Sequence, residues 1–122
     1  MGKLSDKIRE TIAEIRPAII ATASRDGKPN VSAKGSFRVL DDDHVVFADI
    51  SSPRTIANLR ENPGISILVM HPRSMKGCRL WGKAEVLDSG ELFERISREF
   101  AERNIEVKHV VKIEVEEAQE SF

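Results

Sequence analysis

The feature that most constrains the fold of this sequence is a succession of short apolar stretches separated by turn-forming residues. Residues 18–24 (AIIATAS) are rich in apolar and β-branched side chains. The Asp26-Gly27 pair that follows favours a tight hairpin, because both central residues of such a turn adopt positive φ. Residues 31–40 (VSAKGSFRVL) then alternate as a strand with one buried face does. The pattern predicts antiparallel strands joined by hairpins.

The strand predicted over residues 31–40 has one face toward the core and one polar face. The core face comprises Val31, Ala33, Gly35, Phe37 and Val39, and the polar face comprises Ser32, Lys34, Ser36 and Arg38. A turn over residues 41–43 (DDD) and a third strand over residues 44–50 follow. Further strands predicted at residues 65–70, 78–87 and 105–115 bring the number to six.

Three short helices are predicted, over residues 5–15, over residues 54–61 and after residue 89. Ser5 is placed to cap the first helix and Ser52 the second. For the third helix the cap is Asp88 or Ser89, with Glu91 placed to complete a capping box with Asp88. Six strands with three short helices bury their apolar faces best when the sheet curls on itself, so the predicted fold is a mainly β, small antiparallel barrel.

The composition is that of an ordinary globular chain. A length of 122 residues fits one domain, spanning 1–122. The 19 Lys and Arg residues against 20 Asp and Glu give a net charge of −1, so nothing in the overall charge favours nucleic acid or an anionic membrane. Cys78 is the single cysteine, the N-terminus lacks the apolar segment of a secretory signal, and the longest apolar run is too short to cross a bilayer. We therefore expect a cytoplasmic protein.

The start of the second predicted helix carries a run of side chains suited to an anion. The sequence there is Ser51-Ser52-Pro53-Arg54-Thr55, directly after a strand. The first N–H groups of a helix have no intrahelical partner and carry partial positive charge, and Arg54 adds a planar cation that matches phosphate. The alternative is that Ser52-Pro53 only begins a surface helix and that Arg54 is solvated. Local chemistry leaves both interpretations open.

The wider pattern resembles the FMN-binding split-barrel family, which includes the pyridoxamine 5′-phosphate oxidases. The resemblance covers roughly residues 15–88, with the last helix and strand in the expected places. The residues that match the family's motif are Phe47, Asp49, Ser52, Arg54, Thr55, Asn58-Leu59, Asn62-Pro63 and, later, Trp81-Gly82-Lys83-Ala84.

This resemblance implies a six-stranded antiparallel Greek-key split barrel that forms a homodimer, with FMN in a groove between the subunits. The phosphate would lie against Ser51, Arg54 and Thr55. The ribityl chain and flavin ring would be lined by Ser32, Ala33, Lys34, Gly35, Ser36, Ala48, Asp49 and Ile50. Lys34 has a second hypothetical role, because a cation near the N1/O2 edge of a flavin favours its reduced, more negative form.

The function that follows from the resemblance is that of an FMN oxidoreductase or electron carrier whose donor or acceptor is a small molecule or a redox protein. Relatives that use the deazaflavin F420 or act around haem make those cofactors the nearest alternative, and a non-catalytic flavin-binding module is another. Pyridoxamine 5′-phosphate oxidase activity itself is not expected, since the sequence has no tyrosine and no basic, aromatic C-terminal segment. A nucleic-acid-binding barrel is disfavoured by the 5% aromatic content.

Several residues with functional chemistry have simpler structural interpretations. His44, His71, His109 and Cys78 have no tight metal-ligand spacing, so no metal site is expected. His109 lies among aliphatic residues, where a hydrogen-bonded structural histidine is commoner than a catalytic base. Trp81 could stack on a flavin or pack in the core, and the basic residues of loop 71–77 could bind an anion or be solvated.

Overall fold

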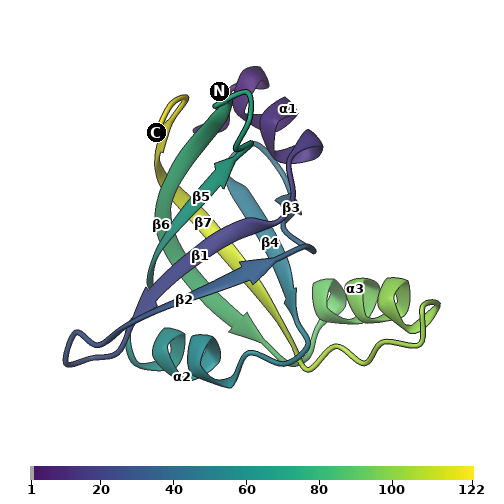
Figure 1. Cartoon of the computed structure of the whole chain (residues 1–122). Helices are drawn as coiled ribbons and strands as arrows, with labels where there is room; N and C mark the ends of the chain where they lie inside the picture. The colour runs from purple at the N-terminus through teal and green to yellow at the C-terminus, as the bar shows by residue number, and fades with distance from the viewer. Residues whose placement is uncertain (1) are drawn as a thin grey trace.

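The computed structural model describes residues 2–122 and shows one curled sheet of seven strands with three helices around it (Figure 1). The strand order is β2-β1-β5-β6-β7-β4-β3, and every neighbouring pair is antiparallel. β2 and β3 are therefore the two edges of the sheet. The helices are α1 (Asp6–Glu14), α2 (Pro53–Glu61) and α3 (Glu91–Ala101). The strands are β1 (Ala18–Ala23), β2 (Pro29–Lys34), β3 (Arg38–Val39), β4 (His44–Asp49), β5 (Gly64–Met70), β6 (Gly77–Leu87) and β7 (His109–Gln119).

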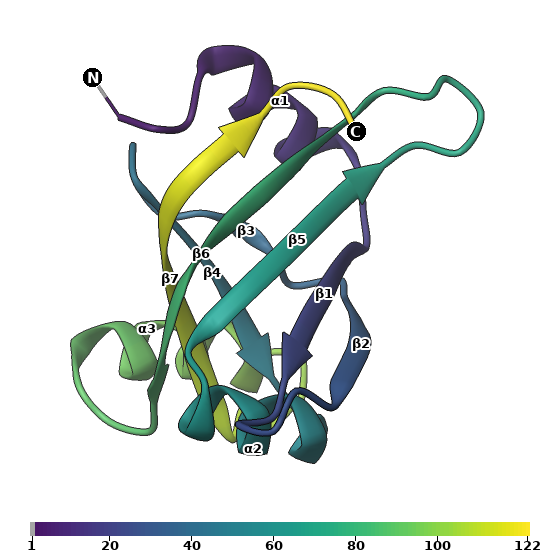
Figure 2. The ribbon, with the colours of Figure 1, turned by 90° about the vertical axis from the view of Figure 1, so that its left-hand side faces the viewer.

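The concave side of the sheet holds the main core, and α1 and α2 lie at its two ends (Figure 2). α1 contributes Ile8 and Ile12, and α2 contributes Ile56 and Leu59, to the same cluster as the inward side chains of the strands. A second, smaller cluster lies between α3 and the outer face of the sheet, where Val46, Ala48 and Val110 belong to one buried group with Ile96. Because both faces of β4 are covered, five consecutive residues of this strand, 45–49, are buried.

The mainly β, curled antiparallel architecture with three helices is confirmed, but the prediction of six strands is wrong. The stretch predicted as one strand over residues 31–40 is two strands, because β2 ends at Lys34 and the chain turns before β3. β2 pairs with β1, whereas β3 pairs with β4 on the opposite edge of the sheet. The turn therefore carries the chain from one edge of the curled sheet to the other.

The predicted faces of β2 are also inverted. Val31 is 66% exposed and Ala33 is exposed, whereas Lys34 is only 8% exposed. Alternation alone identifies two faces of a strand but not which one the rest of the molecule covers. Here the polar face of β2 is turned inward, toward the start of α2, and the apolar face points outward.

Three local predictions need correction. The β1–β2 connection is a loop over residues 24–28 in which only Gly27 has positive φ (91°), so the turn is not the predicted tight hairpin. Ser5 caps α1 through its hydroxyl, as predicted, but Ser52 makes no side-chain cap on α2. α3 is preceded by Gly90 and has no side-chain cap either, so the box of Asp88 and Glu91 does not form.

The last strand begins later than predicted. β7 spans His109–Gln119 rather than 105–115, because residues 105–108 cross from α3 to the sheet before pairing begins. The Lys108 N–H donates to the carbonyl of Asp49 at 2.9 Å, which brings the start of β7 against the end of β4. This junction places the polar side chains of both strands beside the start of α2.

Candidate functional site

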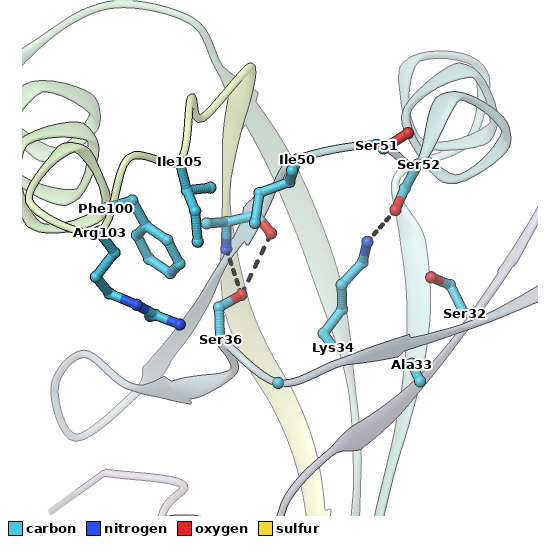
Figure 3. Close-up of a pocket in the computed structure, with 12 residues that line it drawn as sticks. Ser32, Ala33, Lys34, Ser36, Ile50, Ser51, Ser52, Phe100, Arg103 and Ile105 are labelled. Carbon is cyan, nitrogen blue, oxygen red and sulfur yellow. Dashed lines mark hydrogen bonds between the residues drawn. The ribbon is translucent and has the colours of Figure 1, made fainter.

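A hollow of about 510 Å³ lies between β2, the end of β4 and the segment that follows α3 (Figure 3). We call it the first hollow. Its volume is within the range of roughly 300–1,000 Å³ usual for small-molecule sites. It is lined by Ser32, Ala33, Lys34, Gly35, Ser36, Ala48, Ile50, Ser51, Ser52, Phe100, Arg103 and Ile105.

Lys34 is the buried cation of the first hollow. Its ammonium donates a hydrogen bond to the hydroxyl of Ser52 and lies 5.6 Å from the centre of the Phe47 ring. Burial lowers the pKa of Lys34, because desolvation disfavours the charged form, and the nearby carboxylate of Asp49 opposes this effect. The side chain is therefore a cation that the protein alone compensates only in part.

Ser36 fixes the turn after β2 against β4. Its hydroxyl accepts from the Ala48 N–H at 2.9 Å and donates to the Ala48 carbonyl at 3.2 Å. Gly35 lies between Lys34 and Ser36, and a Cβ built on it meets nothing within 4 Å. Ser36 thus holds the turn in place, and open space remains beside Gly35, where a flat ligand can approach the backbone.

The far end of the first hollow has a different chemistry. Phe100, at the end of α3, and Ile105 provide apolar surface, and the Arg103 guanidinium lies 5.2 Å from the centre of the Phe100 ring (Figure 3). Arg103 is exposed and has no ion-pair partner among residues 2–122. The hollow therefore has a cation at each end, one buried and one exposed.

Asp49 connects the first hollow to the start of β7. Its Oδ1 accepts from the Ser52 N–H at 2.8 Å, and its Oδ2 lies 2.7 Å from Nδ1 of His109. Asp49 is 2% exposed, so both bonds satisfy a buried carboxylate. The turn into α2 is consequently fixed by Asp49 rather than by a cap from Ser52.

A second hollow, of about 460 Å³, lies on the other side of the turn at residues 51–52. It is lined by Asp49, Ser51, Ser52, Pro53, Ile56, Ala57, Arg60, Lys108 and His109. Asp49 lies on the opposite face of β4 from Ala48, which explains why Asp49 lines the second hollow and Ala48 lines the first. Ser51 and Ser52 line both.

A third, smaller hollow, of about 210 Å³, contains the arginine predicted to bind phosphate. It is lined by Lys28, Pro29, Asn30, Arg54, Ala57 and Asn58. Thr55 is 1% exposed, and its hydroxyl accepts from the Asn30 amide at 3.3 Å. Arg54 thus lies next to the beginning of β2, and the hydrogen bond to Thr55 fixes the side chain of Asn30.

The predicted cofactor residues are gathered only in part. The first hollow brings together Ser32, Ala33, Lys34, Gly35, Ser36, Ala48, Ile50 and Ser51, but not Asp49, Arg54 or Thr55. Three further residues, which reach the hollow from the far end of α3, were not predicted from the sequence: Phe100, Arg103 and Ile105. Nothing local in the sequence indicates that this segment packs beside β2, since the two are about seventy residues apart.

The other residues with functional chemistry lie apart from one another. His44 pairs with Asp41 at 2.8 Å, Cys78 is buried, and His71 accepts backbone N–H bonds within its own loop. Trp81 does not line the first hollow and is stacked by Arg79, whose guanidinium carbon lies 4.7 Å from the ring centre. Within residues 2–122 no three potential metal ligands gather, and no helix is long and apolar enough to span a membrane.

Comparison with known proteins assigns the family. Residues 4–122 match the pyridoxamine 5′-phosphate oxidase family, and the chain belongs to it. An uncharacterized protein of Methanocaldococcus jannaschii is 34% identical over 91 residues, which are 73% of this chain and 60% of the relative. The match thus spans less than two thirds of that relative's length.

Solved structures share the fold. HupZ of Group A Streptococcus superposes with a TM-score of 0.87 at 26% identity, over 93% of this chain and 90% of HupZ. An FMN-binding protein from Syntrophomonas wolfei has a TM-score of 0.83 at 21% identity, over 94% of this chain and 84% of that protein. An F420 reductase and the haem storage protein HutZ of Vibrio cholerae also share the fold, at TM-scores of 0.70 and 0.68 and identities of 16% and 22%.

Proposed function

We propose that this protein binds FMN in the first hollow, at the interface of a homodimer, and acts as an FMN-dependent oxidoreductase or electron carrier. The observation that carries the proposal is Lys34, a buried cation that faces a hollow of suitable size. A buried lysine is costly unless it is compensated, and an anionic or electron-rich ligand supplies that compensation. Membership of the pyridoxamine 5′-phosphate oxidase family and the FMN-binding protein of the same fold support a flavin as that ligand.

The residues present fit FMN in extended form. The first hollow follows the end of β2 and the turn after it, from Ser32 to Ser36, and the third hollow lies at the beginning of the same strand, at residues 28–30. A flavin ring beside Gly35 would direct the ribityl chain past the hydroxyls of Ser32 and Ser51. The phosphate would then reach Arg54, whose planar guanidinium suits phosphate oxygens.

The outward face of β2 supports the homodimer. Val31 is 66% exposed on an edge strand, with exposed Pro29 and Ala33 on the same face. An apolar face on a sheet edge is a surface that proteins usually cover. Ile50, which lines the first hollow, is also 38% exposed. A second subunit on β2 would cover this face and close the open side of the site.

When bound, the flavin supplies the hydride or electron transfer, and the chain's own residues bind and orient it. Lys34 would lie near the N1/O2 edge, where it stabilises added negative charge. Ser36, held by its two bonds to Ala48, keeps the turn beside the ring in place. Phe100 and Ile105 would limit water at the far end of the hollow.

Two other cofactors define the second candidate function. The F420 reductase and the haem storage protein of the same fold show that this architecture occurs with other ligands. F420 would suit the same buried cation, whereas haem would need an axial ligand, and no histidine lines the first hollow. The geometry therefore favours a flavin or deazaflavin over haem.

The experiment that tests the proposal is cofactor identification followed by titration. We expect the purified protein to show flavin absorbance, to release FMN, and to bind added FMN with quenching of its fluorescence. Lys34→Met should weaken FMN and riboflavin together, whereas Arg54→Ala should weaken FMN about 10- to 100-fold and riboflavin little, as loss of a charge-assisted bond predicts. Lys3→Met, at an exposed lysine, is the control. A colourless protein that does not bind FMN would refute the proposal.

A further inference from the structure

The second hollow contains a group of charged side chains that the proposed flavin site does not use. His109, Lys108 and Arg60 line it, together with the buried carboxylate of Asp49. Neither Arg60 nor Lys108 forms an ion pair within the part of the chain that is described. Asp49 is the one acidic side chain among the residues that line the hollow, and its two oxygens are already bonded to the Ser52 N–H and to His109, so two cations face the hollow beside a single carboxylate.

The Asp49–His109 pair fixes which imidazole nitrogen is available. Nδ1 lies 2.7 Å from Oδ2 of Asp49, and an ionised carboxylate can only accept, so Nδ1 carries a proton. Nε2 makes no hydrogen bond to residues 2–122. The His109 side chain is 23% exposed, and that of Asp49 is 3% exposed. A buried carboxylate behind a partly exposed imidazole is the arrangement that orients a histidine for proton transfer or ligand binding.

Besides the charged residues and the two serines at residues 51–52, the lining of the second hollow is apolar. Pro53, Ile56 and Ala57, from the first turns of α2, form it. A ligand that fits both walls has an anionic group for the cations and an apolar body for the helix. The volume of about 460 Å³ is sufficient for a small ring compound.

We propose that the second hollow binds a small organic anion, a carboxylate or phosphate monoester with an apolar body, which contacts Nε2 of His109. Arg60 and Lys108 bind the anionic group, and the apolar body packs on Ile56. Asp49 is a positioning residue that holds the imidazole with Nε2 toward the ligand. The inference depends on Asp49, His109 and Arg60 and not on FMN in the first hollow.

The test is a titration of the full chain observed by NMR at the histidine ring Cε1–H signals. His44→Gln and His71→Gln assign the signal of His109 by elimination, without changing the site. Phenyl phosphate and benzoate are the anionic probes, and benzyl alcohol is the neutral probe. We expect a saturable shift of the His109 signal with at least one anion, no saturable shift with benzyl alcohol, and no comparable response at His71. A stronger response to phenyl phosphate or to benzoate identifies the anionic group that the hollow prefers.

Matched arginine variants test the binding residues. Arg60→Gln should weaken the anion about tenfold, as the loss of a charged partner predicts. Arg95→Gln, at an exposed arginine of α3 outside the hollow, should leave the affinity unchanged. No saturable shift of His109, or equal effects of the two substitutions, would overturn the proposal.

The role of Asp49 has a separate readout. A long-range ¹H–¹⁵N correlation should show the Nδ1–H tautomer of His109 in the unaltered protein, and Asp49→Asn should change the tautomer population and weaken the anion. Unchanged tautomer and affinity in a folded Asp49→Asn protein would refute the positioning role.

A competition experiment separates this inference from the proposed flavin function. If saturating FMN abolishes the response of His109 to phenyl phosphate, the second hollow belongs to the flavin site and the inference fails. If the protein ignores FMN while His109 still responds to the anion, the inference stands and the proposed function fails.

Discussion

At the scale of single residues, Lys34 shows how burial and charge together indicate a ligand. Its polar neighbours are a neutral hydroxyl, on Ser52, and a carboxylate, on Asp49, that is already hydrogen-bonded to two other groups. Burial lowers its pKa in spite of the Asp49 charge. The protein by itself therefore stabilises the neutral form relative to solution, and a bound anion would reverse this.

The lowered pKa of Lys34 predicts that its contribution to FMN binding is lost at alkaline pH. The ammonium is charged below its pKa, so its attraction for an anionic cofactor disappears as the pH rises through that pKa, which lies below 10.5. We expect the ratio of the FMN dissociation constants of Lys34→Met and the unaltered protein to be largest near pH 7 and to approach one as the pH rises toward 10.5. Fluorescence titrations at matched ionic strength measure it. A ratio independent of pH would contradict the prediction.

Cys78 predicts a separate effect on stability. Burial raises the pKa of its thiol from 9.0 to about 11, because desolvation disfavours the thiolate. The unfolded chain loses this proton first, so the stabilisation is present below pH 9.0 and is lost as the pH rises through about 11. The loss amounts to about 2–3 kcal/mol.

Urea unfolding at pH 8 and pH 11 checks the Cys78 prediction. We expect the free energy of unfolding to fall by about 2–3 kcal/mol more in the unaltered protein than in Cys78→Ala, in which no thiol titrates. The quantity compared is the change in the free energy of unfolding between pH 8 and pH 11. The cavity that alanine leaves lowers the stability at both pH values and therefore cancels from this change. Parallel pH profiles of the two proteins would refute a buried thiol as the cause.

At the scale of elements, the pairing of β6 with β7 depends on a glycine. The register between the two strands shifts between Trp81 and Gly82, so a bulge lies at this point. A Cβ at Gly82 would collide with the carbonyl oxygen of Glu114 on β7. Only a residue without a side chain allows the two backbones to come this close. The close approach of β6 and β7 thus explains why the Trp81–Ala84 motif contains a glycine, independently of any ligand.

Substitution of this glycine should destabilise the sheet. We expect Gly82→Ala to lower the free energy of unfolding by about 1–3 kcal/mol, because β7 must move to accept the methyl group. Gly35→Ala is the matched control, since its Cβ would meet nothing within 4 Å, and its effect should stay within about 0.5 kcal/mol. Chemical denaturation measures both. Equal stabilities of the two variants would show that the bulge tolerates a side chain.

At the scale of the whole molecule, the sequence predicted the elements better than their faces and neighbours. Periodicity located the ends of α2 and β5 to within one residue, because their apolar positions recur regularly between residues that interrupt helices and strands. It failed over residues 31–40, where alternation continues through the turn at Gly35 although the chain changes partner strands. Local patterns report local geometry and contain no information on which edge of the sheet the chain joins.

The same limit applies to the candidate site. Ser32, Lys34 and Ser36 were predictable because alternation places them on one face of a strand and the family resemblance points to that strand. Phe100 and Arg103 were not, since their proximity depends on how α3 packs on the outer face of β4 and β7. The predicted inward orientation of Val31 was wrong for a related reason: alternation separates the two faces of β2 but does not say which of them the core covers.

The exposed apolar face of β2 predicts the state of assembly. Val31 is 66% exposed, and a charge there would need to be buried if a second subunit covers the strand. We expect the protein to sediment as a dimer, and Val31→Asp to sediment as a monomer with weaker FMN binding, because the open side of the first hollow would then face solvent. Met75→Asp is the control, since Met75 is 62% exposed in the distant 71–77 loop, and this variant should remain dimeric and bind FMN normally. Sedimentation velocity with and without FMN measures both, and a Val31→Asp protein that stays dimeric would place the subunit interface on another surface.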